Sequence, residues 1–138
     1  MNDVRPRILI IDDDENVLIA LERLLEEAGY CTATAWSGKE ALDTLQKSEF
    51  DLLLVDEHLP ELNVINLVNH LEHARHRAYR LLMCPFPVRD QGAEGIPRSA
   101  IHGAVCKWEH SAITAKIQNY LPANRVEHQL ERSLSTSA

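Results

Sequence analysis

The chain has 138 residues, 45% of them apolar, and a formal net charge of -7 at neutral pH. This length suffices for one domain with its own core. The acidic balance and the scattered basic residues argue against a nucleic-acid-binding surface, which needs clustered Lys and Arg. The first apolar run is too short for a signal peptide or a membrane span, so we expect a cytoplasmic protein without membrane contact.

Cysteine usage agrees with that compartment. Cys31, Cys84 and Cys106 are odd in number and have no CxxC spacing. We therefore expect reduced thiols, as is usual in cytosolic proteins.

The first elements follow one another closely. Residues 8–11 are a short apolar run that predicts a strand, and residues 17–28 carry an apolar stripe at helical spacing. Asp14 can cap this helix, and Gly29 stands where a helix commonly ends. Residues 30–35 then alternate between polar and apolar, which predicts a second strand.

The middle of the chain repeats this rhythm. Ser37 and Glu40 form a capping-box pattern before a second helix. Residues 51–56 lead into and complete a buried third strand. A third helix is expected from Val64 to about Arg75, because apolar residues recur there at helical spacing.

The last third is less regular. Residues 79–84 predict a fourth strand, but Pro and Gly punctuate residues 85–97, so the fourth helix should be short, broken or mobile. Residues 103–106 predict a fifth strand. A fifth helix follows over residues 113–121, with Ser111 as its expected cap.

We place the domain at residues 1–122, because Pro122 ends the compact pattern. In residues 123–138, apolar side chains recur every four positions in a polar background. This tail is either a short extra helix or the stub of a linker.

Alternating strands and helices imply a parallel sheet with helices on both faces. Five strands fit an α/β, doubly wound, flavodoxin-like sheet in the order 2-1-3-4-5. In that order the first and third strands are neighbours, and their carboxyl ends lie at the ligand-binding edge of the sheet.

Acidic residues follow those two strands. Asp12 and Asp13 close the first, and Asp56 closes the third. Three converging carboxylates repel one another unless a cation lies between them, and a hard divalent cation such as Mg²⁺ prefers oxygen ligands. Lys107 follows the fifth strand, about 10 Å from Asp56, a gap that its side chain can largely span.

These residues resemble the receiver domain of two-component response regulators. The resemblance covers roughly residues 5 to 121 and rests on three motifs: Ile-Leu-Ile-Ile-Asp-Asp-Asp at 8–14, Asp-Leu-Leu-Leu-Val-Asp at 51–56 followed by Leu59-Pro60, and Gly-Ala-Val-Cys-Lys at 103–107. It implies a phosphorelay module and not an enzyme beyond its own phosphotransfer and dephosphorylation. The implied partners are a histidine kinase or phosphotransfer protein, a downstream effector or output domain, and a second copy bound through the face of the fourth helix, fifth strand and fifth helix.

The resemblance also implies residue roles. Asp56 is similar to the phosphoacceptor, a carboxylate nucleophile. Asp12 and Asp13 resemble the metal-binding pair, with a further oxygen from Asp56 and another from the backbone carbonyl of His58. Lys107 resembles the lysine that pairs with phosphoryl oxygens, because phosphoryl transfer depends on positioning and charge neutralisation.

The departures from the family concentrate in its switch. Cys84 stands at the Ser/Thr position of strand 4, and a thiol is a weak hydrogen-bond donor. Pro85 then restricts Cys84 to extended conformations. Ala104 replaces the aromatic switch residue, and Trp108 replaces the proline after the lysine, so we expect a trans bond there. Asn63-Val64 replaces the usual Asp-Gly. We therefore expect weak coupling between phosphorylation and the switch.

Other readings stay open at this point. The chain could be a pseudo-receiver, a phosphorylation-independent interaction or dimerisation module. It could also be a small hydrolase with Asp56 as nucleophile, although Asp56-Glu57-His58 lacks the Asp-x-Asp turn of haloacid-dehalogenase-type phosphatases. Each site residue also has a purely structural alternative: a helix cap for Asp12 or Asp13, a turn residue for Asp56 and a solvated strand end for Lys107.

Overall fold

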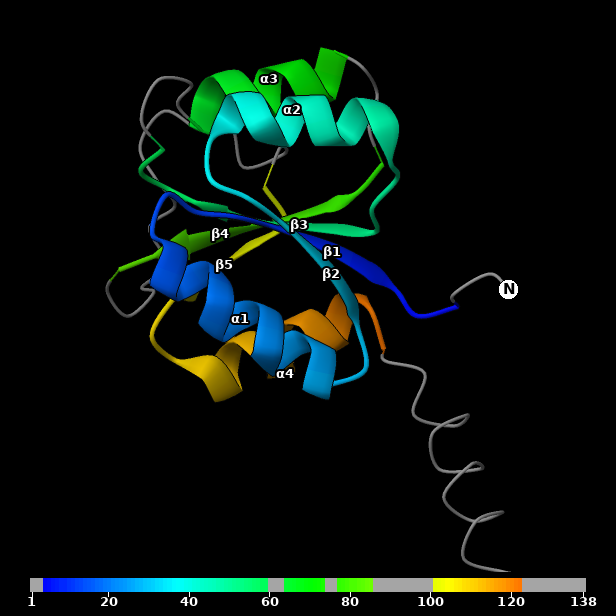
Figure 1. Ribbon diagram of the computed structural model, residues 1–138, viewed down its shortest axis with the longest axis vertical. Coiled ribbons are helices and arrows are strands. Elements are labelled where there is room, and N and C mark those ends of the chain that lie inside the picture. Colours follow the sequence, from blue (N-terminus) through cyan, green and yellow to red (C-terminus); the bar gives the residue numbers. More distant parts are fainter. Residues whose placement is uncertain (1–3, 60–63, 74–76, 86–100, 123–138) are drawn as a thin grey trace, which may run out of the picture.

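The computed structural model describes residues 4–59, 64–73, 77–85 and 101–122. Five strands and four helices lie in these segments (Figure 1). In chain order they are β1 (Arg7–Ile11), α1 (Glu15–Glu27), β2 (Cys31–Ala35), α2 (Gly38–Lys47), β3 (Leu52–Asp56), α3 (Val64–His73), β4 (Tyr79–Cys84), β5 (Gly103–Cys106) and α4 (His110–Tyr120). The helix labelled α4 corresponds to the fifth helix expected from the sequence.

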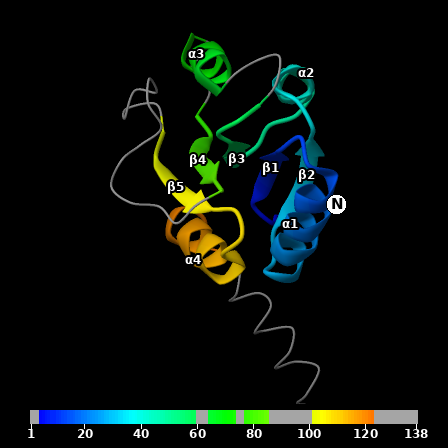
Figure 2. The same ribbon diagram turned by 90° about the vertical axis from the view of Figure 1, so that its left-hand side faces the viewer.

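The strands form one sheet in the order β2-β1-β3-β4-β5, with each neighbouring pair parallel. Figure 2 shows this order across the view. Helices α2 and α3 cover one face, and α1 and α4 cover the other (Figure 1). The doubly wound, flavodoxin-like prediction is therefore confirmed.

Two apolar layers hold the helices on the sheet. Alternate residues of β1 and β3 face opposite sides, because successive side chains of a strand point to opposite faces. Ile8, Ile10 and Leu54 pack under α1 and α4, whereas Leu9, Ile11 and Val55 pack under α2 and α3. The central strands are buried on both faces, which explains their continuous apolar sequence.

The expected caps of the first two helices are present. The Asp14 side chain accepts a hydrogen bond from the Asn16 amide, and Ser37 accepts one from the Glu40 amide. Gly29 follows α1 with a φ of 101°, a left-handed conformation that glycine adopts without steric cost. Local sequence thus sets where these helices begin and where α1 ends.

The cap prediction for the last helix was wrong. Helix α4 begins at His110, with Glu109 as its N-cap, so Ser111 lies inside the helix. The Glu109 amide bonds back to the Cys106 carbonyl at 3.1 Å, which turns the chain immediately after β5. That turn starts the helix before a serine can cap it, and no side-chain hydrogen bond caps this end.

The punctuated segment at 86–97 and the tail at 123–138 lie outside the described residues, as does Asn63. None of the helices in the described segments is long and apolar enough to cross a membrane.

Candidate functional site

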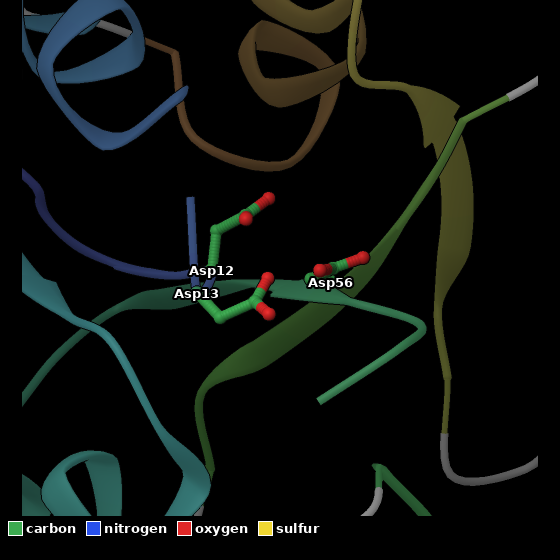
Figure 3. Close-up of side chains that lie close together, drawn as sticks. All are labelled: Asp12, Asp13 and Asp56. Atoms are coloured by element: carbon green, nitrogen blue, oxygen red, sulfur yellow. The ribbon is translucent and has the colours of Figure 1, made fainter. Parts of the chain in front are cut away.

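Three carboxylates converge at the carboxyl ends of β1 and β3. Asp12, Asp13 and Asp56 each offer an oxygen, and these atoms all lie within 4.8 Å of one another. Figure 3 shows the three side chains gathered at the ends of these two strands. Asp12 and Asp56 are buried, with 0% and 2% of their surface exposed, whereas Asp13 is exposed. The strand order brings them together, because β1 and β3 are hydrogen-bonded neighbours.

Backbone hydrogen bonds hold the loops that carry these acids. The Asp12 amide donates to the Ala35 carbonyl at 3.1 Å, and the Asp12 carboxylate accepts from the Asp14 amide at 2.9 Å. On β3, the Asp56 carboxylate accepts from the His58 amide at 3.3 Å. Asp12 and Asp56 are thus each oriented by the turn that follows their own strand.

Lys107 closes the site from β5. Its Nζ lies 3.2 Å from Asp12 Oδ2 and 3.6 Å from Asp56 Oδ1, and its side chain is 12% exposed. The Lys107 amide donates to the Cys84 carbonyl at 2.9 Å, which fixes its backbone beside β4. The lysine therefore spans the gap expected from the sequence and contacts both buried carboxylates.

Burial sets the electrostatics of the pocket. Burial, followed by the nearby charge of Asp12, raises the pKa of Asp56 to about 6. Burial also raises the pKa of Asp12, although Lys107 and the Asp14 amide oppose this shift. For Lys107, burial lowers the pKa, but the charges of Asp56 and Asp12 outweigh it and raise the pKa overall. The site therefore carries a charge cost that a further cation would relieve.

Cys84 occupies the end of β4 but its thiol is engaged elsewhere. Its hydrogen-bond partner is the Glu57 carboxylate, and burial together with this contact raises the pKa of the thiol to about 12. Cys84 is the last residue of the strand, in agreement with the extended conformation expected before Pro85. The thiol is therefore a neutral group held by a neighbouring acid.

The other two departures lie on or after β5. Ala104 is half-buried and packs against the core on the α2 and α3 face. Trp108 is 60% exposed, and its ring centroid lies 5.6 Å from Lys107 Nζ. The described residues contain no cis peptide bond, as expected for the bond between Lys107 and Trp108.

Glu57 is the residue of this edge that the sequence analysis missed. It follows Asp56 directly, and its amide donates to the Met83 carbonyl at 3.0 Å, which continues the pairing of β3 with β4. Strand alternation was a usable signal, because residues two apart share a face. Glu57 therefore follows Val55 on the face that also carries Cys84.

Comparison with known proteins identifies the family. The model of the response regulator receiver domain matches residues 8–117. The chain belongs to the response regulator receiver family. This receiver domain is 41% identical over 58 residues to the transcriptional regulatory protein PrrA of Mycobacterium tuberculosis, an alignment that covers 42% of the chain and 25% of PrrA.

Solved structures show the same fold. The chemotaxis protein CheY4 of Vibrio cholerae superposes with a TM-score of 0.74 at 22% identity, over 84% of this chain and 98% of that one. The response regulator TrrA of Thermotoga maritima, solved in complex with Mg²⁺ and BeF, gives 0.74 at 24% identity, over 84% and 99%. The curated relatives are longer than the match: the aligned segment of this receiver domain spans a quarter of PrrA.

Proposed function

We propose that this receiver domain accepts a phosphoryl group on Asp56 from the phosphohistidine of a histidine kinase or phosphotransfer protein, in a Mg²⁺-dependent reaction. One observation supports this most directly. Asp56 is a buried carboxylate with two other acids within 4.8 Å and an ammonium group 3.6 Å away. Phosphoryl transfer needs such a combination of a nucleophile and surrounding charge.

In this reaction Asp56 is the nucleophile and the donor imidazole is the leaving group. A carboxylate oxygen of Asp56 attacks the phosphorus, the new O–P bond forms, and the N–P bond of the donor imidazole breaks. The imidazole nitrogen keeps the electron pair and takes a proton from water. Lys107 then lies where its ammonium can neutralise a phosphoryl oxygen, in exchange for its contact with Asp56.

The residues fit a magnesium ion. Mg²⁺ prefers carboxylate, carbonyl and water oxygens, and three carboxylate oxygens meet here. We propose that Asp12, Asp13 and Asp56 hold the ion together with the backbone carbonyl of His58. When bound, the ion neutralises charge on the transferring phosphoryl group.

The remaining parts of the proposal concern partners and extent. We propose that residues 1–122 are the receiver unit and that residues 123–138 are a tail, either a short helix or the stub of a linker. Receiver domains are generally not enzymes, and we propose that this one catalyses only its own phosphotransfer and dephosphorylation. The resemblance to response regulators also supports a downstream effector or output domain, and a homodimer through the face to which β5 and α4 contribute.

The test is phosphorylation by acetyl phosphate in Mg²⁺, followed by intact mass. We expect one added phosphoryl group on the wild type and none on Asp56→Asn. Asp43→Asn is the matched control, because Asp43 is an exposed acid on α2. Equal labelling of wild type and Asp56→Asn would refute Asp56 as acceptor. No labelling of the wild type by acetyl phosphate or a phosphorylated histidine kinase would instead favour a phosphorylation-independent interaction module.

A further inference from the structure

A groove lies between α1 and β2, the edge strand of the sheet. Helix α1 packs against this strand (Figure 2). The groove has a volume of about 430 Å³, which falls within the range of about 300 to 1,000 Å³ that small-ligand sites occupy. Of the residues that line it, only Asp13 belongs to the phosphoryl-transfer site proposed above. The other side chains therefore need an explanation of their own.

One wall of the groove is a face of α1. Glu15, Ile19 and Glu22 line it, and their spacing places them on the same side of the helix. Glu26 continues this face by one more turn and accepts a hydrogen bond from Thr32 Oγ1 at 3.0 Å. That bond holds the far end of the wall against β2.

The opposite wall is the matching face of β2 and the residue after it. Thr34 and Trp36 line the groove, and together with Thr32 they are alternate residues, which share one face of a strand. The helix runs back along the strand, and two residues of strand rise about 6.6 Å whereas four residues of helix rise about 6 Å. Counted from the hydrogen bond at Thr32, the next position, Thr34, therefore lies opposite Glu22. Trp36 lies one step further, opposite Ile19.

Charge and apolar surface alternate along the groove. Glu22 lies at one end, and Glu15 and Asp13 lie at the other. The two glutamates are seven positions apart on the helix, a rise of about 10 Å. Trp36 and Ile19 lie between these ends and are 67% and 55% exposed, so the apolar middle is open to a ligand from solvent. Among the described residues, neither glutamate forms an ion pair with a lysine or an arginine.

We propose that this groove binds a linear aliphatic polyamine. Such a ligand carries ammonium groups joined by methylene chains, and thus has the order of charge and apolar surface that the groove presents. One ammonium group pairs with Glu22, and another pairs with Glu15 and Asp13. The methylene chain between them covers Trp36 and Ile19 and removes their apolar surface from water. The Trp36 ring also attracts a nearby ammonium group through its π face.

Other classes of ligand fit the groove less well. A single metal ion cannot bridge the two glutamates, because about 10 Å separates their backbone positions and metal–oxygen bonds are about 2 to 2.6 Å long. A nucleotide or a phospholipid headgroup brings phosphate, which the three carboxylates repel. A second copy of this chain carries a net charge of -7, so two copies repel each other as well.

The groove and the carboxylate cluster share Asp13. A bound polyamine and a bound Mg²⁺ would both draw on this carboxylate, so each should weaken the binding of the other. The described lining of the groove includes neither Asp12 nor Asp56. Binding of a polyamine therefore does not depend on phosphorylation of Asp56, and the two proposals can fail separately.

The experiment titrates the full isotope-labelled chain with diamines of increasing length at constant ionic strength, in metal-free buffer so that no metal ion competes for Asp13. The probes are tetramethylene-, hexamethylene- and octamethylenediamine, and octylamine is a matched ligand with one charge. The indole N–H signal of Trp36 reports the groove, and that of Trp108, the other tryptophan, is the internal reference. We expect the Trp36 signal to shift and saturate. Octamethylenediamine should bind about two- to fivefold more tightly than either octylamine or tetramethylenediamine, because only it reaches an acid at each end.

Matched variants separate the groove from a general attraction of cations to an acidic protein. Glu15→Gln and Glu22→Gln should each weaken the binding of octamethylenediamine about two- to fivefold and remove most of its advantage over octylamine. Glu27→Gln is the control, because Glu27 is exposed on α1 and does not line the groove. Affinities that do not depend on the length of the diamine, or that fall equally in Glu27→Gln, would overturn the proposal. A Trp36 shift caused by protein concentration alone would do so too, because a second copy would then fill the groove.

Discussion

The two halves of the sheet's carboxyl edge differ in how closely they follow the receiver pattern. The half built by β1 and β3 carries Asp12, Asp13 and Asp56 in one cluster, as the motifs predicted. The half built by β4 and β5 carries Cys84 and Ala104, where the family resemblance leads one to expect a hydroxyl and an aromatic ring. Lys107 belongs to the second half in sequence but contacts the acids of the first.

This contrast separates two tasks within one fold. Phosphoryl transfer needs charge placed within a few ångström of the reacting oxygen, and the β1 and β3 half has that charge. Propagation needs a group that moves when the phosphoryl group arrives, and neither a thiol held by Glu57 nor an alanine suits that movement. We therefore expect substitutions in the site to slow phosphoryl transfer strongly. Propagation of the signal should already be weak in the wild type.

The largest effect should come from Lys107→Gln. It removes the only cation within contact distance of Asp12 and Asp56 among the described residues. Loss of one such stabilising group typically slows a reaction by about 10² to 10³. The rate of acetyl phosphate labelling measures this, with Lys39→Gln on the exposed face of α2 as the control. A rate within twofold of wild type would show that the second half contributes nothing to the chemistry.

Without metal, the ionised Asp56 should lower the free energy of unfolding by about 3 kcal/mol. The pKa of Asp56 is about 6 in the folded protein and 3.8 in a model carboxyl group. The folded state therefore binds this proton more tightly, so the contribution of Asp56 to stability is fully present below pH 4 and is lost as the pH rises to about 6. Asp56→Asn removes this dependence and should be more stable above pH 6 by about 3 kcal/mol.

Urea unfolding in a chelator at pH 5 and pH 7.5 tests this prediction, with Asp43→Asn as control. Magnesium should recover about half of the wild type's lost stability, about 1.4 kcal/mol, when its concentration is ten times the dissociation constant. If Asp56→Asn and Asp43→Asn unfold alike at pH 7.5, the carboxylate pocket is not under electrostatic strain.

The smallest effect should come from Cys84→Thr, which puts a hydroxyl at the end of β4. A hydroxyl is a stronger hydrogen-bond donor than a thiol, and one such bond is worth about 1 kcal/mol. Beryllofluoride and Mg²⁺ should then shift the amide signals of residues 101–110 more in the variant than in the wild type. Cys31→Thr, the same change in β2, is the control. Large shifts in the wild type itself would contradict the weak coupling of the second half.

Much of this molecule follows from local sequence. The five strands were predicted to within a residue: apolar runs marked the central strands, which are buried on both faces, and alternation of polar and apolar residues marked β2. Asp14, Ser37 and Gly29 act within a few residues of themselves, so their roles at helix ends could be anticipated. Ser111 failed because a competing turn after Cys106 began the helix earlier.

The candidate site was only partly visible in the sequence. The acids could be placed at one edge once the strand order was inferred, since parallel strands end at the same edge. The sequence could not predict that the Lys107 ammonium contacts both Asp12 and Asp56. Nor could it predict the contact between Cys84 and Glu57. Both depend on side-chain directions across strands that are far apart in the chain.

The amino-acid order alone determined the alternation of strands and helices, and with it the residues that close each strand. Only the tertiary structure decided how deeply Asp12 and Asp56 are buried, and that Cys84 stands opposite Cys106. The physical reason is that burial and register are properties of packed neighbours. Desolvation and strand spacing act between residues that the sequence separates by tens of positions.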